Sequence, residues 1–383
     1  MTDPLRVLCV TPSGPEGRGG IDRLYHYLRE AAPDGLAGID LRYAAARGEA
    51  GALWPLAFPL RLLRVARVLQ SFRPQVVHIN FANRGSAWRK YAVLRLARAF
   101  GARIVVHLHD SLPVDALKSQ ALAGRLFLAI CRGADRVVAL GEASARALVM
   151  HGVATEKVRV VLNGIPDFAA DIALPKPVGD DVVILLAGRV GTHKGVGILI
   201  DALSLLHRRG LGGWRCVIAG DGEVEDYAER AVLLGLSEHV YFTGWIEADG
   251  VHSLMRQADI VVLPSVAEAL PLSLAEGACA GAALVATPVG NVPEILRNGV
   301  NGRLVTRDPI ALAEALTVLI EDRGLLGRMQ LASRMHYRER LTLDAFASNL
   351  AAIYAEFTAL PGTESATGRG PGPSAPALPG SSA

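Results

Sequence analysis

Short runs of Val, Ile and Leu alternate with longer segments of helical periodicity, and this alternation is present in both halves of the chain. In the first half we expect a helix at residues 21–30 and strands at residues 5–10, 75–79, 104–107, 136–139 and 158–162. In the second half we expect strands at residues 182–186, 216–219, 240–242, 260–263 and 283–286. Such alternation is typical of parallel sheets with helices on both faces. We therefore predict an α/β fold with two Rossmann-like, doubly wound domains.

The length of 383 residues exceeds what one ordinary core accommodates and fits two domains of about 150 to 200 residues. Residues 166–181 contain three prolines, a glycine and an acidic pair, a composition typical of linkers. We predict an N-terminal domain over residues 1–165 and a C-terminal domain over residues 182–344, joined by this linker. Residues 361–383 are rich in Pro, Gly, Ser and Ala, which predicts a disordered tail.

The cysteines are isolated from one another and lie in apolar runs: Cys9, Cys131, Cys216 and Cys279. They form no zinc-binding motif, so we expect buried free thiols in a reducing compartment. The first ten residues do not resemble a signal peptide, and arginines interrupt the longest apolar runs before they reach membrane-spanning length. We expect a cytoplasmic protein.

Charge is distributed unevenly along the chain. Residues 1–170 hold 23 Lys and Arg against 13 Asp and Glu, a balance of +10, so the remainder carries −7 of the net charge of +3. No acidic residue occurs between Glu49 and Asp110, and within this gap RLLRVARVL at residues 61–69 has the pattern of a basic amphipathic helix. One interpretation is attachment to an anionic membrane surface. The other is an arginine-rich solvated surface. Nucleic acid is not an expected partner, because no aromatic-interleaved groove or known motif accompanies the charge.

A first functional segment is VVILLAGRVGTHKG, in which a buried strand ends at Gly188 and a helix opens at Gly195. Ligands of parallel α/β sheets bind at the carboxyl ends of strands, where helix N-termini offer free N–H groups. Arg189 and Lys194 beside such a helix would suit a diphosphate. Two solvated charges in a loop are the alternative.

A second segment, IVVLPSVAEALPLSLAEGACAG, places two carboxylates at the mouth of one strand–helix unit. Glu268 lies in the loop after the strand, Pro271 suits the first helical position, and Glu276 falls about one turn into the helix. A carboxylate can accept both hydrogens of a vicinal diol, as found on a sugar or a ribose. An unpaired charge at Glu276 would be costly in such an apolar helix, which argues against a merely solvated surface position.

Together these segments resemble the signature of the retaining group 1 glycosyltransferases, which have the GT-B fold. The matching pieces are Gly188-Arg189, Lys194-Gly195, Gly220-Asp221-Gly222, Glu268 through Glu276, and VATPVGNVPEIL. In the first half, QVVHIN and ADRVVALGEASARALVMHGV are also similar to family segments, so the resemblance covers roughly residues 5–358. It implies two Rossmann-like domains facing a cleft, with a C-terminal helix at residues 345–360 returning to complete the N-terminal domain.

The resemblance also implies roles for individual residues. Arg189 and Lys194 would hold the diphosphate of a nucleotide sugar, and Glu276 its ribose. The other implied sugar-donor-binding residues are Gly20, Gly220, Leu270 and Leu272, with Gly19 beside Gly20 in the first loop. The implied catalytic residues are His109, at the end of the segment VVHLHD, and Glu268, which would contact the transferred sugar.

Departures from the family pattern affect small residues near the site. This chain has Glu276-Gly277 where the family commonly has Glu-Ala, Ala283 where it has Pro, and Gly290-Asn291 where two glycines are usual. Thr192-His193 replace a more variable pair. Both carboxylates and both cations are retained, so these changes concern the choice of sugar rather than activity.

The resemblance implies transfer from a nucleotide-diphosphate sugar, with net retention, to a saccharide or polyprenyl-linked acceptor in polysaccharide or glycolipid synthesis. We expect no cofactor and no metal requirement, because no DxD-type cluster follows a strand. A GT-B epimerase-like enzyme and a non-catalytic GT-B binding subunit stay open as alternatives. A nicotinamide-dependent oxidoreductase is disfavoured, because the first loop lacks GxGxxG.

Overall fold

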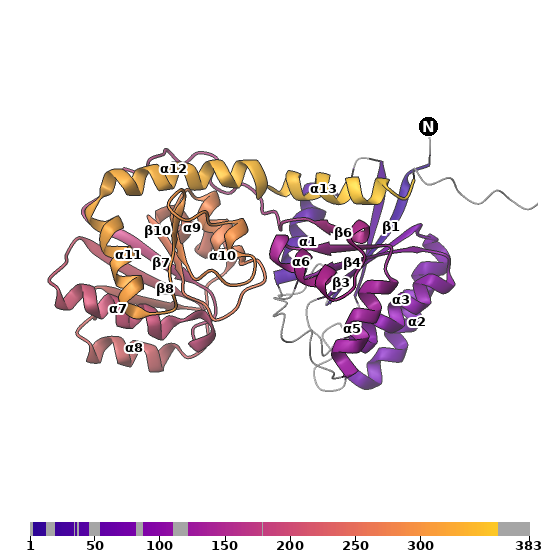
Figure 1. Ribbon diagram of the computed structural model, residues 1–383, viewed down its shortest axis with the longest axis horizontal. Coiled ribbons are helices and arrows are strands. Elements are labelled where there is room, and N and C mark those ends of the chain that lie inside the picture. Colours follow the sequence, from indigo (N-terminus) through magenta and orange to yellow (C-terminus); the bar gives the residue numbers. More distant parts are fainter. Residues whose placement is uncertain are drawn as a thin grey trace, which may run out of the picture.

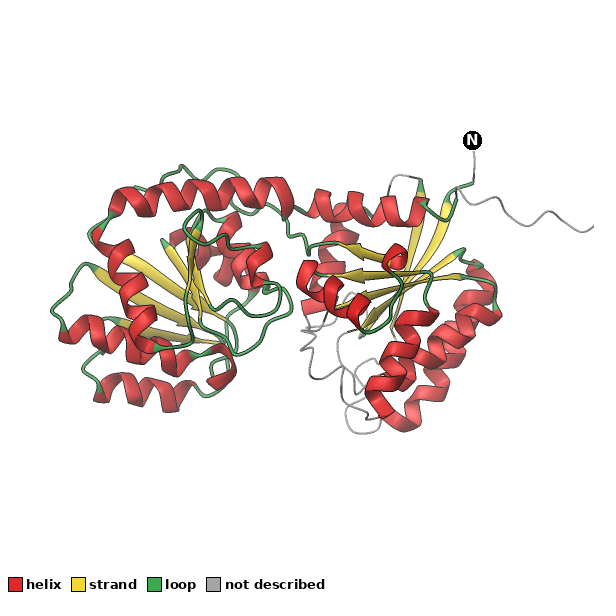
Figure 2. Ribbon diagram, in the orientation of Figure 1, coloured by secondary structure: helices red, strands yellow, loops and turns green. Residues whose placement is uncertain are grey.

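The computed structural model describes residues 3–12, 20–33, 35–36, 38–45, 54–81, 87–109, 122–177 and 179–358, and the chain folds into two α/β domains (Figure 1). The predicted tail at residues 361–383 lies outside the described residues. In each domain the sheet is covered by helices on both faces (Figure 2). The predicted fold class, two doubly wound Rossmann-like domains, is confirmed.

The N-terminal domain contains a six-stranded parallel sheet with the order β2-β1-β3-β4-β5-β6. Its strands are β1 (Leu5–Thr11), β2 (Ile39–Ala45), β3 (Val76–Phe81), β4 (Arg103–Leu108), β5 (Arg136–Ala139) and β6 (Val158–Val160). Its helices are α1 (Gly20–Ala31), α2 (Trp54–Phe72), α3 (Ala87–Ala99), α5 (Leu122–Gly133) and α6 (Glu142–Met150). The central strands β3 and β4 are mostly apolar and almost fully buried, as expected of a sheet covered on both faces.

The C-terminal domain repeats this architecture, with the strand order β12-β11-β10-β7-β8-β9. Its strands are β7 (Val182–Ala187), β8 (Trp214–Ala219), β9 (Val240–Gly244), β10 (Ile260–Leu263), β11 (Ala283–Ala286) and β12 (Gly302–Leu304). Its helices are α7 (Val196–Arg208), α8 (Val224–Leu233), α9 (Ala248–Gln257), α10 (Leu272–Cys279), α11 (Pro309–Glu321) and α12 (Arg323–Arg340). The chain reverses its direction of strand addition between β7 and β10, which are neighbours. Ligands of such sheets bind at this switch point.

The last helix, α13 (Leu343–Ala355), returns to the N-terminal domain, as predicted. It continues the line of α12 along one side of both domains (Figure 1). Phe346, Leu350 and Tyr354 are buried in a core cluster of the N-terminal domain. The Tyr354 hydroxyl and Nδ1 of His78 on β3 are 2.7 Å apart. The N-terminal core is therefore completed by the end of the chain.

Element boundaries differ from the predictions by small amounts. Most predicted strands extend one or two residues further, whereas the strand predicted at residues 158–162 ends at Val160. Pro271 directly precedes α10 and does not occupy its first position, contrary to the prediction.

All four cysteines are buried and form no disulfide, as predicted. None of the described helices combines the length and apolar composition needed to cross a bilayer.

Candidate functional site

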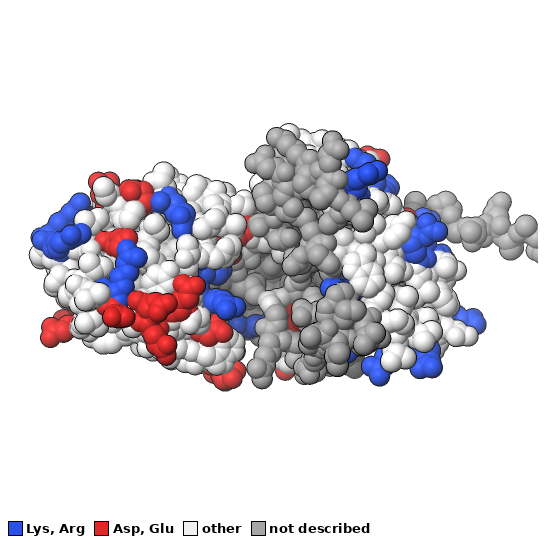
Figure 3. Space-filling view, turned by 90° about the horizontal axis from the view of Figure 1, so that it is seen from below, with Lys and Arg blue, Asp and Glu red and all other residues white. Residues whose placement is uncertain are grey.

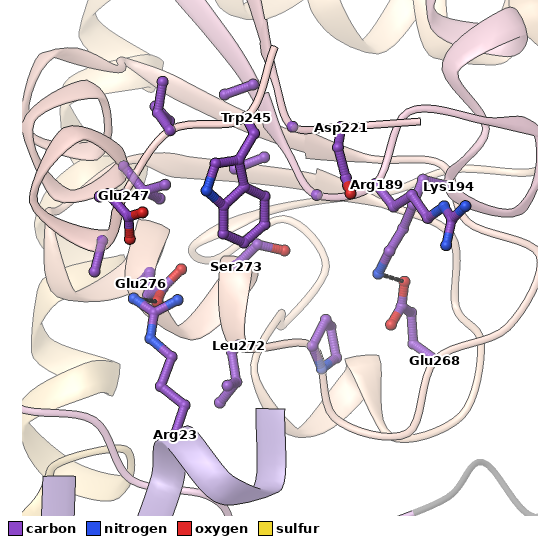
Figure 4. A pocket seen from close by; sticks show the side chains of 18 of the residues that line it. Arg23, Arg189, Lys194, Asp221, Trp245, Glu247, Glu268, Leu272, Ser273 and Glu276 are labelled. Carbon is purple, nitrogen blue, oxygen red and sulfur yellow. Dashed lines mark hydrogen bonds and ion pairs between the residues drawn. The ribbon is translucent and has the colours of Figure 1, made fainter. Parts of the chain in front are cut away.

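A cavity of about 600 Å³ lies at the switch point of the C-terminal sheet, with one wall supplied by α1 of the N-terminal domain. The loops after β7, β8, β9 and β10 form the rest of its wall, because parallel strands place their carboxyl ends at one edge of the sheet. Figure 4 shows the charged side chains of these loops converging on the cavity.

Seven of the predicted site residues line this cavity: Arg189, Lys194, Gly220, Glu268, Leu270, Leu272 and Glu276. Two cations and two carboxylates that are far apart in sequence therefore meet at one place. Their convergence follows from the topology, because the cations follow β7, the carboxylates follow β10, and β7 and β10 are hydrogen-bonded neighbours.

Lys194 and Glu268 form an ion pair, with 2.6 Å between Nζ and Oε1. The Ser265 hydroxyl also donates to Oε1 of Glu268, at 2.7 Å. Both carboxylate contacts are largely screened from water, since Glu268 is 9% exposed and Ser265 is fully buried. Glu268 is thus held rigidly at the mouth of the loop after β10.

Arg189 lies beside Lys194 at the same end of the cavity, and its side chain is exposed (Figure 4). Among the described residues it forms no ion pair, so its guanidinium is available to a ligand. The first turn of α10, beginning at Leu272, also faces the cavity. The N–H groups of a first helical turn have no partner within the helix. The Arg189 guanidinium and the N-terminus of α10 together favour an anionic group such as a phosphate.

Glu276 is buried in α10, with only 4% of the residue exposed. Burial raises the pKa of its carboxyl to about 7, and the positive charge of Arg23 partly opposes this increase. Nη2 of Arg23 is 3.3 Å from Oε1 of Glu276. The two groups are not aligned for a hydrogen bond, and among the described residues Oε1 has no hydrogen-bond partner. A buried acceptor of this kind is available to a hydroxyl donor.

Sequence reasoning missed several residues of the cavity wall, among them Arg23, Trp245 and Glu247. Arg23 comes from α1 of the other domain, and Trp245 and Glu247 follow β9. Trp245 is 61% exposed, and its indole projects into the cavity near Glu276 (Figure 4). An exposed aromatic ring at a cavity mouth is a signal that the sequence carried, in the segment FTGWIEADG, but its orientation required the structure.

His109 does not line this cavity. It lies directly after β4, and its Nε2 is 2.8 Å from Oδ1 of Asn80. The Asn80 amide nitrogen donates to the Val10 carbonyl, so its oxygen must accept and His109 Nε2 must donate. Burial, with smaller effects of His78 and Lys90, lowers the pKa of His109 to about 3. The imidazole is therefore neutral at pH 7 and keeps Nδ1 as an acceptor. Its catalytic role stays a prediction.

Gly20 begins α1 and faces the C-terminal domain. A Cβ atom at Gly20 would lie 3.8 Å from Cδ1 of Leu272, so the start of α1 reaches the cavity rim. Gly220 lies where the loops after β7 and β8 meet, since a Cβ there would be 2.0 Å from the Gly188 carbonyl oxygen. Gly19 lies outside the described residues.

Two departures from the family pattern have a structural reason. A Cβ at Gly277 would lie 2.8 Å from Cγ2 of Val261, so α10 packs more closely on β10 than an alanine allows. Asn291 forms a clasp between the domains: its amide nitrogen donates to the Ser144 hydroxyl and to the Ala269 carbonyl, each at 2.9 Å. The Ser144 bond connects α6 with the segment after β11, and the Ala269 bond connects that segment with the loop that carries Glu268.

The sequence and the fold of this chain are similar to those of known proteins. Residues 181–322 match a family model described as glycosyl transferases group 1, and residues 6–167 match glycosyltransferase family 4. A glycosyltransferase of Methanocaldococcus jannaschii is 30% identical over 213 residues, 52% of this chain and 54% of that protein. The D-inositol 3-phosphate glycosyltransferase of Xylanimonas cellulosilytica is 30% identical over 249 residues, 60% of this chain and 58% of that protein. The chain thus spans little more than half the length of these curated relatives.

Among solved structures, Anabaena HepE in complex with UDP and glucose has a TM-score of 0.72 and 21% identity, covering 92% of this chain and 99% of that chain. Two doubly wound parallel sheets facing a shared cavity define the GT-B class of folds. The similarity to the HepE structure supports the assignment of this chain to the GT-B class. With both halves matched by family models, the chain belongs to the group 1 glycosyltransferase family.

Proposed function

We propose that this protein transfers a sugar from a nucleotide-diphosphate sugar to a saccharide or lipid-linked acceptor, with net retention at the anomeric carbon. The observation that carries the proposal is the convergence of Arg189, Lys194, Glu268 and Glu276 on one cavity of about 600 Å³. That volume is in the range of small-molecule sites. HepE is solved with UDP and glucose, which supports uridine diphosphate sugars as the first candidates to test.

The wall divides into regions suited to the parts of such a molecule. Arg189, Lys194 and the first turn of α10 suit the diphosphate, and Glu276 suits the ribose diol. Trp245 offers an aromatic face on which a base can stack. Glu268 then remains to contact the transferred sugar, and we assign His109, which follows β4 and lies outside this wall, to the side of the acceptor.

The chemical step breaks the bond between the anomeric carbon and the diphosphate oxygen. The acceptor hydroxyl oxygen forms the new bond on the same face, and its proton passes to the departing phosphate. Negative charge grows on the leaving group, so fixed cations and helix N–H groups lower the barrier without rearranging. The expectation that no metal or cofactor takes part stays a prediction.

A thermal-shift panel of UDP, GDP and ADP tests the sugar-donor site directly. One diphosphate should raise the apparent melting temperature, because a ligand that binds only the folded state stabilises it by mass action. Proton NMR of the slow hydrolysis of the matching sugar nucleotide should then show the retained anomer first. No shift with any nucleoside diphosphate or sugar nucleotide would exclude the proposal. An epimerase would instead isomerise the sugar without releasing acceptor product.

We propose further that the acceptor is presented at an anionic membrane surface. The helices α2 and α3 expose apolar side chains beside cations: Leu60 (65% exposed) and Leu63 (55%) lie next to Arg64 and Arg67, and Trp88 (43%) lies on α3. On the face in Figure 3, basic side chains are prominent on the N-terminal domain, whereas acidic ones gather on the C-terminal domain. Apolar side chains flanked by cations suit the interface of an anionic bilayer.

Co-sedimentation with vesicles tests this surface. The protein should pellet with vesicles of phosphatidylglycerol and phosphatidylcholine at low salt, and much less with phosphatidylcholine alone. The double variant Leu60→Ser, Leu63→Ser should remain in the supernatant. The control variant Leu233→Ser, at an exposed position of the C-terminal domain, should pellet with the vesicles as the wild type does. Equal recovery of the protein in the supernatant with and without anionic lipid would refute the membrane proposal and leave the arginines as a solvated surface.

A further inference from the structure

Arg23 crosses from the N-terminal domain to the carboxylate of Glu276. It lies in the first turn of α1, and its guanidinium points at α10 (Figure 4). Nη2 is 3.3 Å from Oε1 of Glu276. Among the described residues, it is the one cation that forms an ion pair with Glu276.

The guanidinium is held in place by other side chains. Its Nε donates to the Tyr27 hydroxyl at 2.7 Å, within α1. Its Nη2 is also 3.5 Å from Nε2 of His252 on α9, and His252 stacks on Phe168 with ring centroids 4.0 Å apart. Arg23 is therefore oriented from two domains rather than swinging freely in solvent.

Glu276 needs such a cation if it is to recognise a diol. Both oxygens of an ionised carboxylate accept hydrogen bonds, so it can bind two hydroxyls as donors, whereas in a protonated carboxyl one oxygen carries a hydrogen and acts as a donor. Burial favours the protonated form, and a nearby opposite charge favours the ionised form. For this carboxyl the two effects leave the pKa at about 7, so the charge state near neutral pH depends on Arg23.

We propose that Arg23 is a positioning residue for nucleotide specificity: it holds Glu276 ionised and aimed so that the carboxylate selects a ribose over a deoxyribose. This inference rests on the proposed function, since it assumes that a nucleotide ribose meets Glu276. Arg23 acts through Glu276, and because it belongs to the other domain, selection of the ribose requires the two domains to be together.

Several other titratable groups lie near the Arg23–Glu276 pair, and their effects on the pH dependence must be distinguished from those of the pair. They are His26 and Tyr27 on α1, Asp249 and His252 on α9, and Glu247 in the preceding loop. Burial, and next the charge of Arg23, lower the pKa of His252 below its ordinary value. A pH effect that persists in the Glu276→Gln variant would belong to these groups and not to the pair.

The test measures the dissociation constant of the best-binding ribonucleoside diphosphate from the UDP, GDP and ADP panel, and of its 2′-deoxy counterpart, between pH 6 and pH 9. For the wild type, loss of the hydroxyl should weaken binding about 10- to 100-fold, as expected for a hydrogen bond to a charged group. At pH 7.5 the wild-type Glu276 carboxyl, with a pKa of about 7, is mostly ionised. In Arg23→Gln the ratio should fall to less than about 5-fold at pH 7.5 and recover at pH 9, since the pH midpoint of Glu276 ionisation moves up by about one pH unit or more. Arg23→Lys should restore most of the ratio.

The outcomes are distinguishable. If the wild type binds none of the diphosphates, the proposed function fails first. If the wild type binds a diphosphate and selects ribose, but Arg23→Gln keeps the same ratio of dissociation constants and the same pH midpoint, the inference alone is overturned. Equal weakening of both nucleotides in Arg23→Gln would also overturn it, because a purely structural role predicts no change in the ratio. Glu276→Gln should lose the ratio at every pH, and Arg95→Gln, an exposed charge on α3, should retain it.

Discussion

Glu276 is a carboxyl that the fold buries although its charge is costly there. Its pKa rises from 4.5 to about 7 on folding, because burial disfavours the ionised form. Between these values the folded state binds more protons than the unfolded state, so stability falls as pH rises through this window. Above about pH 7 the full cost is present, and below about pH 4.5 it is absent.

Replacement of Glu276 by Gln should therefore stabilise the protein at pH 8 while abolishing selection of the ribose. The expected gain in free energy of unfolding is about 3 kcal/mol at pH 8, falling towards zero near pH 4.5. Urea denaturation at both pH values measures it. Glu321→Gln, at an exposed position, should show no such pH-dependent gain. A variant less stable than the wild type at pH 8 would show that Arg23 stabilises the charge more than burial costs it.

At this scale the sequence predicted the residues that follow a strand within one motif. Arg189 and Lys194 follow β7 and Glu268 follows β10, so their position at one sheet edge was predictable from chain order. Arg23 was not predictable, because its contact with Glu276 depends on the separation of two domains. No local pattern encodes that distance. The pairing of Lys194 with Glu268 was also missed, since each was assigned its own part of the ligand.

Strands were predicted well where a run of apolar residues is buried. Strands β5, β10 and β11 have the predicted bounds, because each is a short run of Val, Ile, Leu or Ala, which in β5 follows Arg136. The edge strand β12 was missed, since its three residues, Gly302–Leu304, form no apolar run and pair on one side only. Periodicity detects buried elements and loses short edge strands.

The junction between the β7 and β10 loops gives a prediction at the scale of elements. Gly195 precedes α7 with φ +74°, and a Cβ there would lie 2.0 Å from the Pro264 carbonyl oxygen. Gly210 has nearly the same φ, +71°, but no atom within 4 Å of such a Cβ. Gly210→Ala should cost about 1 kcal/mol for the left-handed backbone alone.

Gly195→Ala should cost about 1–3 kcal/mol more than Gly210→Ala, because the loops after β7 and β10 must also separate. It should further weaken nucleoside diphosphate binding, since Lys194 and Glu268 lie on these two loops. Urea denaturation and thermal shift measure the two effects. Equal destabilisation by both substitutions would mean that the loops move apart without cost, contrary to the rigid site described above.

At the scale of the whole molecule, the sequence predicted two domains and the return of the last helix but not how the domains meet. Contacts across the junction come from α1 against α10 and from α6 against the segment at Asn291. Asn291 was noted only as a departure from a glycine pair. Its buried amide, 1% exposed, is satisfied by Ser144 of the other domain, which explains why a polar side chain is tolerated there.

A double-mutant cycle on Ser144 and Asn291 tests whether this clasp joins the domains. Either single alanine variant already removes the side-chain hydrogen bond between Ser144 and Asn291, and the double variant cannot remove it again, so the double cost should be about 1 kcal/mol less than the sum. The free energy of unfolding in urea measures the coupling. Ser144→Ala combined with Ser204→Ala, a buried hydroxyl on α7 with local partners, should be additive. Additivity in the Ser144–Asn291 cycle as well would mean that this hydrogen bond does not couple the domains, and that other contacts across the junction, such as the Arg23–Glu276 pair and the packing of α13, hold them together.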